Sequence, residues 1–337
     1  MKYCRVALAT LCLLAFAPGS GAYHLLEVRT PDGDIVELSW SSATFPVGYY
    51  VNDRQPLDFS LQEAVDAVNL SFQTWEDVET ATITFELAGL TDAEPFEFFD
   101  DKSTLGFTSD PDLAQPGVLG ATLQVIDIFT GEIVEADIFF SNLFVWSVDP
   151  SGEPNTFDFV SVAVHEIGHF LGQDHSDVGF MESSGFERRL VSGAAIMFPF
   201  SFGPGNVEGR TLTVDDETGV SILYASGGFL QLTGSLAGQV TKGGQGVAFA
   251  HIVAFNPFTG ETIAAFADDN GDYEIEGLSA GPHTVRVNPI SDPASPPDFG
   301  FPELGTDLDY SDTIFQTGIA EVTPSAVTRG IDVEVER

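Results

Sequence analysis

The sequence predicts an α+β domain with one mixed, twisted sheet and three helices, followed by an all-β sandwich. Strand-like and helix-like periodicities alternate between about residues 43 and 226, whereas the remainder shows only strand-like patterns separated by turn signals. Gly227-Gly228 follows the last predicted helix and is the expected hinge. We therefore expect the first domain to span residues 43–228 and the second to span residues 229–337.

The length and the net charge limit the class of protein. A chain of 337 residues exceeds the ~250–300 residues at which single cores stop growing, and a hydrophobic fraction of 43% excludes general disorder. With 12 Lys+Arg against 51 Asp+Glu, the formal net charge is −39. Such a surface repels phosphate backbones and anionic lipids, so we expect no nucleic-acid partner. A cationic substrate, bound calcium and a saline habitat are each compatible with this charge.

The first 22 residues predict an export signal. Lys2 and Arg5 form a basic start, and Val6–Ala17 is an apolar run shorter than the ~20 residues that span a bilayer. Ser20-Gly21-Ala22 then offers a cleavage site. We therefore expect a secreted protein with a signal peptide at residues 1–22; the short apolar run disfavours an uncleaved anchor.

The cysteines support the same interpretation. The only two, Cys4 and Cys12, lie inside the predicted signal peptide, so the mature chain is expected to have no disulfide and no cysteine metal ligand. No later segment is long and apolar enough to span a membrane, and we expect a monomer.

The first domain is predicted to run strand, helix, strands, helix, helix. Ser60 and Glu63 form a capping-box pattern ahead of apolar residues at helical spacing that end at Trp75. Asn155 is expected to cap a second helix that ends at Leu171, and Thr213 a third that reaches Tyr224. The predicted strands are 45–51, 81–87, 118–128 and 133–140.

The second domain shows about seven strand patterns and no helical periodicity, which is typical of a small β-sandwich. Asp269-Asn270-Gly271 is one of its turn signals. A Pro- and Asp-rich stretch, 289–312, is expected to be a long loop. The clearest strands are predicted at 247–255, 261–267, 272–277, 283–288 and 331–336.

The segment from His165 to His175 carries the predicted chemistry. His165 and His169 are four residues apart on one helix face, the spacing at which two imidazoles can hold Zn²⁺ at ~2.0–2.1 Å. Glu166 is placed to contact a water at the metal, and Gly172 lets the chain turn so that His175 becomes the third ligand. Three of six histidines in eleven residues disfavour the alternative, an amphipathic helix with structural histidines.

This pattern, HExxHxxGxxH, is the zinc motif of the metzincins, and the chain resembles their matrixin branch. Ser176 follows the third histidine, and Ala195–Pro199 resembles the Met-turn segment. By this resemblance Met197 would lie beneath the zinc and Pro199 would form part of the S1′ wall. The resemblance covers about residues 43–226 and implies a zinc endopeptidase that acts on proteins or peptides, with one catalytic zinc and Glu166 as general base.

The resemblance also suggests substrate and calcium residues. Leu119, Gly120 and Ala121 would form a rim strand that pairs antiparallel with an extended substrate, although an ordinary sheet strand fits the pattern equally well. Asp137 lies in a stretch that resembles a calcium region of the family, so calcium is a candidate second ion.

Departures from the family pattern are also visible. Phe139 stands where a histidine of a structural zinc site would be expected, so that second zinc should be absent. A cysteine switch is impossible without a mature cysteine. The segment from Ser176 to Met197 is longer than in compact matrixins and is expected to form an extended loop beside the specificity pocket.

The second domain resembles a carboxypeptidase regulatory-like, or transthyretin-like, domain through its Gly238-Gln239-Val240 and Asp269–Ile275 segments. Its Asp-Asn-Gly-Asp run fits a tight hairpin turn better than a calcium loop. Two alternatives to an active protease remain. One is an inactive secreted binding or adhesion protein; the other is a protease kept latent by residues 23–42, where His24, Asp32 or Asp34 would contact the zinc.

Overall fold

A computed structural model describes residues 5–9, 25–54, 56–176, 178–184, 187–193, 195–289, 307 and 309–337. The chain divides into two compact units. The first consists mainly of Leu26–Gln173 and Ser201–Leu212, and the second mainly of Asp174–Phe200 and Thr213–Arg337. The domain boundaries expected from the sequence stay predictions.

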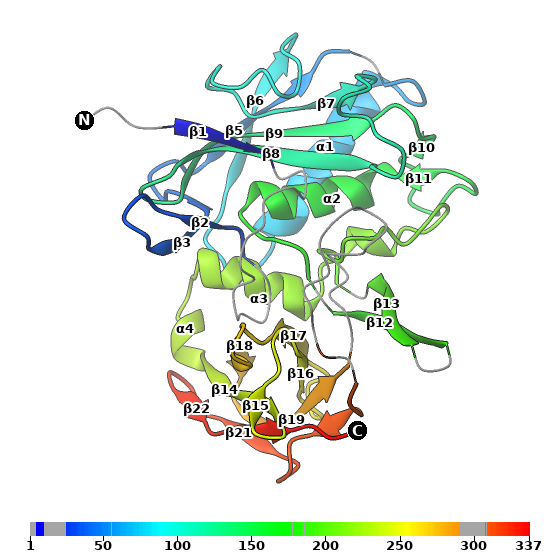
Figure 1. Ribbon diagram of the computed structural model, residues 1–337. Helices are drawn as coiled ribbons and strands as arrows, with labels where there is room; N and C mark the ends of the chain where they lie inside the picture. The colour runs from blue at the N-terminus through cyan, green and yellow to red at the C-terminus, as the bar shows by residue number, and fades with distance from the viewer. Residues whose placement is uncertain are drawn as a thin grey trace. The chain divides into compact units, whose positions relative to one another are not determined.

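The first unit is built on one mixed sheet of seven strands (Figure 1). The strand order is β1-β8-β9-β7-β5-β6, and β4 also pairs with β9. β5, β6, β7 and β9 run parallel, whereas β8 runs antiparallel to β9. The bounds are β1 (Arg5–Ala9), β4 (Ser39–Trp40), β5 (Val47–Asn52), β6 (Phe85–Thr91), β7 (Thr104–Thr108), β8 (Gly120–Asp127) and β9 (Glu132–Ser141).

Three of the four predicted strands are confirmed, as β5, β8 and β9, and the prediction for 81–87 is displaced. Its strand is β6, Phe85–Thr91, because the ladder with β5 begins only at the pair Val47↔Phe85. β1 pairs antiparallel with β8. Its five residues belong to the predicted signal peptide, so their removal would leave β8 as an edge strand. Shorter pairs are β2 (Glu27–Arg29) with β3 (Ile35–Glu37) and β10 (Trp146–Ser147) with β11 (Phe157–Asp158).

The first helix, α1 (Leu61–Glu76), begins at the predicted capping box. The Ser60 hydroxyl accepts the Glu63 N–H at 3.3 Å, and the Glu63 carboxylate accepts the Ser60 N–H at 2.8 Å. Both bonds satisfy N–H groups that a helix start otherwise leaves unpaired. Trp75 is fully buried and its indole N–H donates to the Val164 carbonyl at 2.8 Å, which ties α1 to the second helix.

The second helix, α2 (Phe159–Phe170), starts later than predicted. Its N-cap is Asp158, whose carboxylate accepts the Ser161 N–H at 2.9 Å, and not Asn155. Asn155 instead has φ +69°, a left-handed conformation that suits the preceding turn and not a helix cap. Asp158 also forms an ion pair with Arg210, which follows in the short 3₁₀ helix η1 (Glu208–Arg210). The start of α2 is thus fixed by both a cap and an ion pair.

Aromatic side chains fill the space between the sheet and the start of α2. The ring of Phe159 lies 4.7 Å from that of Phe140 on β9 and 5.2 Å from that of Phe107 on β7, measured between centroids. Trp146 packs edge-on against Phe159. Large aromatic side chains bury much apolar surface each, so this cluster anchors α2 to the sheet.

The strands of the second unit form a β domain, as predicted, with two five-stranded sheets. One has the order β15-β14-β18 with β22 and β23 beside β14; the other has the order β17-β16-β19-β20 with β21 beside β19. The bounds are β14 (Thr233–Lys242), β15 (Gln245–Gly246), β16 (His251–Phe255), β17 (Thr262–Phe266), β18 (Asp272–Ser279), β19 (Gly281–Asn288), β20 (Thr313–Ile314), β21 (Ala320–Val322), β22 (Val327–Arg329) and β23 (Val333–Glu334).

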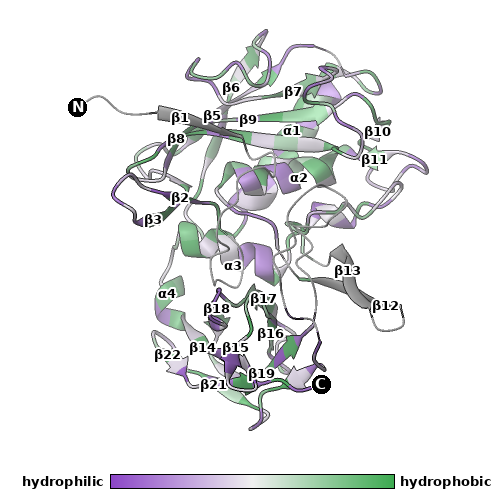
Figure 2. Ribbon diagram, viewed as in Figure 1, coloured by the Kyte–Doolittle hydropathy of each residue, from purple (hydrophilic) through white to green (hydrophobic). Residues whose placement is uncertain are grey.

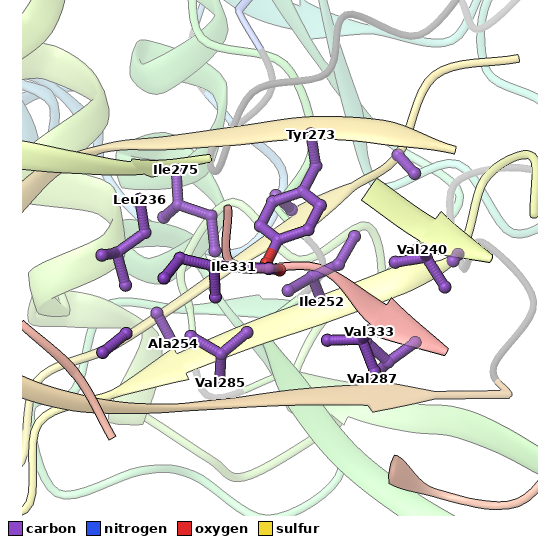
Figure 3. Packing of buried hydrophobic residues seen from close by; sticks show 14 of the residues in the cluster. Leu236, Val240, Ile252, Ala254, Tyr273, Ile275, Val285, Val287, Ile331 and Val333 are labelled. Carbon is purple, nitrogen blue, oxygen red and sulfur yellow. The ribbon is translucent and has the colours of Figure 1, made fainter. Parts of the chain in front are cut away.

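Side chains from both sheets share one apolar core. Figure 3 shows Leu236 and Ile275 from one sheet near Ala254 and Val285 from the other, and all four are fully buried. Tyr273 enters this core with its hydroxyl turned to Ile331, whose carbonyl accepts a hydrogen bond at 2.6 Å (Figure 3). This buried polar contact joins β18 to the chain just before β23.

The rest of the second unit contains helices and a hairpin. The third predicted helix is α3 (Val214–Leu223), which begins at Thr213, and a short helix that the sequence did not predict, α4 (Phe229–Leu232), follows it. The loop expected between Ser176 and Met197 is an antiparallel pair, β12 (Gly179–Ser184) with β13 (Glu187–Gly193). In the loop predicted at 289–312, residues 290–306 and 308 lie outside the described residues. No helix among the described residues is long and apolar enough to span a bilayer.

Replacing Tyr273 with Phe should lower the free energy of unfolding by about 1–3 kcal/mol, because the Ile331 carbonyl would remain buried without its donor. Urea unfolding, followed by circular dichroism, measures this change. Tyr50→Phe is the control, since the Tyr50 hydroxyl makes no hydrogen bond within the described residues and its loss should change stability by less than about 0.5 kcal/mol. Equal effects of the two substitutions would contradict this assignment.

Candidate metal centre

Three histidines from eleven consecutive residues converge. Ligand nitrogens of His165, His169 and His175 all lie within 4.8 Å of one another, and they are the one such group of three or more metal-binding side chains among the described residues. The rings of His165 and His169 project from one face of α2, with centroids 4.9 Å apart and planes at 86°. The predicted ligand set is therefore brought together by the local chain.

The donor set fits zinc. Three imidazoles with no fourth protein ligand are a common composition of catalytic zinc sites, which keep one position open for water or substrate. His169 is buried, and its Nδ1 lies 2.8 Å from the Gln173 carbonyl, which can only accept. Nδ1 must therefore carry the proton, so that the lone pair is on Nε2, the atom that can bind a metal.

The end of α2 is held by residues from three other parts of the first unit. The His169 carbonyl accepts a hydrogen bond from the Gln124 side chain on β8 at 2.5 Å. The Phe170 carbonyl accepts the indole N–H of Trp40 at 2.8 Å, and the Gly172 carbonyl accepts the Leu26 N–H at 2.8 Å. The last carbonyls of a helix lack partners within it, so these donors satisfy groups that would otherwise be unpaired and buried.

The chain turns at Gly172, as predicted. Its φ is +98°, a conformation that side chains rarely adopt and glycine adopts without steric cost. The chain can therefore leave α2 within two residues of Phe170 and carry His175 back to the first two ligands. Figure 2 shows that α2 combines hydrophilic and hydrophobic residues, as expected for a helix that is packed in a core and also carries a polar site.

Glu166 lies in the same turn of α2 as the first ligand and is almost fully buried. Its Oε2 accepts a hydrogen bond from the hydroxyl of Thr122 on β8 at 2.8 Å. Burial raises the pKa of Glu166, while the neighbouring His169 ring and the Thr122 hydroxyl oppose that rise. The carboxylate is thus in a fixed position and in an environment that favours holding a proton. Sequence analysis missed Thr122, because no local pattern links it to a residue 44 positions away.

The predicted rim residues lie at the start of β8. Gly120 pairs with Phe140 on β9, and a Cβ at Gly120 would lie 3.2 Å from Glu166 Oε1, so this position lies against the carboxylate. Ala121 is the next residue of the strand, and Leu119 precedes it, with its carbonyl accepting the Ser141 N–H. Their contact with substrate stays a prediction.

The Met-turn segment is fixed by a buried carboxylate. Asp216 of α3 accepts the N–H groups of Ile196 and Met197, both at 3.0 Å, and also caps its own helix through the Thr213 N–H at 2.8 Å. Met197 is fully buried, and its carbonyl accepts the Ser176 N–H at 2.8 Å. The structure thus joins the Met-turn to the residue that follows the third ligand. Pro199, predicted to form part of the S1′ wall, is half-buried, and that role stays a prediction.

Asp137, the predicted calcium residue, lies on β9 and is buried. Its Oδ1 accepts the Thr104 N–H at 2.7 Å and its Oδ2 accepts the Phe96 N–H at 2.6 Å. Burial raises its pKa to about 7, although these two backbone bonds act in the opposite direction. Both oxygens therefore bind backbone donors, and calcium binding at Asp137 stays a prediction.

Phe139, two residues further along β9, lies in an apolar cluster. It is fully buried, pairs with Ala121 across the strands and packs on the ring of Phe96 at 5.1 Å. These apolar side chains surround the position at which the family resemblance suggested a histidine.

The sheet, the ligand helix with its HExxH pattern, the third histidine after Gly172 and the buried Met-turn define a zinc metalloprotease scaffold of the metzincin type. A sequence model of the matrixin family of peptidases matches residues 39–225, which is more than half of the chain. The chain belongs to the matrixin family.

Two plant proteins are similar to more than half of this chain. Metalloendoproteinase 1 of Glycine max is 25% identical over 193 residues, which are 55% of this chain and 52% of that protein. Metalloendoproteinase 2-MMP of Arabidopsis thaliana is 31% identical over 202 residues, which are 56% of this chain and 44% of that protein. The chain thus spans about half the length of the curated relatives that it matches.

Replacing Trp40 with Phe should destabilise the first unit by about 1–3 kcal/mol, because the buried Phe170 carbonyl loses its donor while most of the ring packing remains. Chemical denaturation of the zinc-saturated protein measures the change. Phe129→Leu, at a half-exposed position, is the control and should shift the unfolding free energy by less than about 0.5 kcal/mol. A Trp40→Phe protein as stable as the control would contradict the role of this bond.

The raised pKa of Asp137 predicts a pH dependence of stability. The folded state holds the Asp137 proton more tightly than the unfolded state, so this residue's contribution to the unfolding free energy falls as pH rises from about 4 to about 7. Asp137→Asn should remove that dependence, and the two curves should differ in slope by up to about 1.4 kcal/mol per pH unit. Denaturation at several pH values in calcium-free buffer measures it, with the exposed Asp112→Asn as control. Parallel curves for wild type and Asp137→Asn would refute the assignment.

Proposed function

We propose that this protein is a secreted, zinc-dependent endopeptidase that hydrolyses peptide bonds of extracellular proteins. The observation that carries the proposal is the convergence of His165, His169 and His175 beside the buried carboxylate of Glu166. Membership of the matrixin family and the names of the two plant relatives support the same activity. The three imidazoles would hold the zinc, and Glu166 would act as general base and then as general acid.

Zinc held by the three imidazoles would supply Lewis acidity that activates a water molecule and polarises the scissile carbonyl. Glu166 then takes a proton from that water at a carboxylate oxygen and returns it to the departing amine. Its burial and the Thr122 hydroxyl fix the carboxylate before substrate arrives, so little reorganisation is needed during the reaction. The raised pKa of Glu166 favours its holding the proton between the two steps.

The substrate is proposed to bind as an extended peptide along the start of β8. Leu119, Gly120 and Ala121 lie there, and Gly120 adjoins Glu166, so a peptide paired with this segment would pass close to the carboxylate. The absence of a side chain at Gly120 leaves room beside Glu166. Pro199 is proposed to line the pocket for the residue after the scissile bond.

The main alternative is a secreted binding protein with an inactive metalloprotease scaffold. All three ligands, the general base and its Thr122 partner are in place, and this favours an active enzyme. Zinc content together with casein or gelatin cleavage, with and without a chelator, distinguishes the two.

The latent-protease alternative concerns residues 23–42. Leu26, Leu38 and Trp40 are buried in the first unit, and Leu26 and Trp40 donate hydrogen bonds to the end of α2. This supports a segment that remains in the active protein. Asp32 lies in the exposed turn between β2 and β3, and His24 lies outside the described residues. Full activity of a protein that begins at Tyr23 would exclude latency through this segment.

Replacing Glu166 with Ala should leave zinc binding intact and lower kcat/KM for peptide hydrolysis by about 10²–10⁴-fold, the usual contribution of a general acid–base group. Zinc content by atomic absorption and cleavage of a fluorogenic peptide library measure the two effects. Glu153→Ala, at an exposed position, is the matched control and should retain wild-type activity. A Glu166→Ala protein with zinc and wild-type activity would overturn the mechanism, and a wild-type protein without zinc-dependent cleavage would overturn the function.

A further inference from the structure

The first turn of α3 contacts the residue that follows the third histidine and also the Met-turn. Asp215 accepts the hydroxyl hydrogen of Ser176, the residue after His175, at 2.5 Å. Asp216, the next residue, accepts the N–H groups of the Met-turn described above. Asp215 and Asp216 are almost fully buried, so these contacts are shielded from solvent. The position of α3 therefore determines where the backbone that follows His175 lies.

α3 also packs against the β domain. Ile222 packs against the apolar core that the two sheets share. On β17, which is an edge strand, the backbone N–H of Ala264 points at Asp215 Oδ1 at 3.5 Å. An edge strand leaves a row of N–H and C=O groups without partners, and here a helix covers part of that row.

Gly277 of β18 lies directly against α3. A Cβ placed at Gly277 would lie 2.4 Å from the Thr218 methyl carbon of α3 and 3.3 Å from the Phe229 ring. Real Cβ atoms do not approach carbon so closely, so a side chain at Gly277 would push on the Thr218 side chain and, through it, on α3. The absence of a side chain at Gly277 permits the observed packing of α3 against β18.

We propose that the β domain positions the metal centre through α3. The chain of contacts runs from Gly277 and Ala264 through α3 to Asp215, and from there to Ser176 beside His175. The β domain is then part of the machinery that holds the third ligand, and not only an appended binding module. This inference rests on the proposed function, because it takes His175 as a zinc ligand.

Such a coupling is reciprocal. If the packing of α3 against the β domain changes the affinity for zinc, bound zinc must stabilise that packing by the same free energy. Outer contacts that orient metal ligands typically change metal affinity by about 10–100-fold when they are lost. Displacement of α3 should therefore weaken zinc binding without any change to a ligand or to Glu166.

The test is Gly277→Ala in the full-length protein, compared with Gly318→Ala. Gly277 has φ +69° and Gly318 has φ +80°, so alanine strains the backbone at either position, but a Cβ at Gly318 would contact nothing within 4 Å. Zinc affinity is measured by competition with a chelator, and ligand geometry by the absorption bands of the cobalt-substituted protein. Gly277→Ala should lower zinc affinity about 10–100-fold and shift the cobalt bands, while Gly318→Ala leaves both unchanged.

The rescue variant is Thr218→Ser combined with Gly277→Ala. Serine lacks the methyl carbon that the new Cβ would strike, and it keeps the hydroxyl that donates to the Val214 carbonyl at 2.6 Å. The double variant should recover zinc affinity, cobalt bands and kcat/KM. Recovery distinguishes a displaced α3 from a general loss of stability, which the methyl deletion would not restore.

The outcomes separate the two hypotheses. A folded Gly277→Ala protein that binds zinc as tightly as Gly318→Ala overturns the coupling alone. A wild-type protein that binds no zinc overturns the proposed function, and the coupling with it. If Gly277→Ala does not fold, Ile222→Val replaces it, since this substitution removes one methyl group from the same contact; a measurable loss of zinc affinity supports the coupling and unchanged affinity overturns it.

Discussion

The metal centre depends on how α2 ends. A helix that stops in the interior leaves its last carbonyls without partners, and unpaired carbonyls there would favour fraying of the turn that carries two ligands. Here Gln124, Trp40 and Leu26 satisfy the carbonyls of His169, Phe170 and Gly172. The carbonyl of Gln173 instead accepts a hydrogen bond from Nδ1 of the His169 ring. The same hydrogen bonds that end the helix therefore also orient a ligand and direct the chain to the next one.

Buried carboxylates also stabilise the fold. Some of them accept hydrogen bonds from backbone N–H groups of an irregular segment. Asp137 holds the loop before β7 through the N–H of Phe96 and the start of β7 through the N–H of Thr104, and Asp216 holds the Met-turn in the same manner. Burial raises the pKa of both groups, and the backbone donors act against that rise. A carboxylate with several fixed N–H partners can specify a loop conformation without a metal ion, at the cost of desolvating a charge.

The sequence predicted those parts of the structure whose signals are local. The capping box of α1 and the spacing of the three histidines involve residues at most ten apart, so the pattern itself contains both partners. Contacts between distant residues were missed, such as Thr122 with Glu166 and Asp215 with Ser176, because no periodicity relates their positions. The start of α2 was placed at Asn155 although Asp158 caps it, since either residue type is a good cap and only the backbone conformation decides.

The excess of acidic residues limits how the buried carboxylates can be stabilised. With 12 Lys+Arg against 51 Asp+Glu, most carboxylates cannot be paired with a cation, and the buried ones at Asp137, Asp215 and Asp216 take hydrogen bonds from N–H and O–H groups instead. Such bonds act over less than 3.5 Å at buried positions, whereas exposed ion pairs are screened over a Debye length of about 10 Å at 0.1 M salt. The contacts that surround the metal centre are therefore of the kind that high ionic strength weakens least. Hydrogen bonds from neutral N–H and O–H groups to buried carboxylates would preserve the metal centre in saline surroundings. The negative net charge is then a property of the protein surface and not of the chemistry at the metal centre.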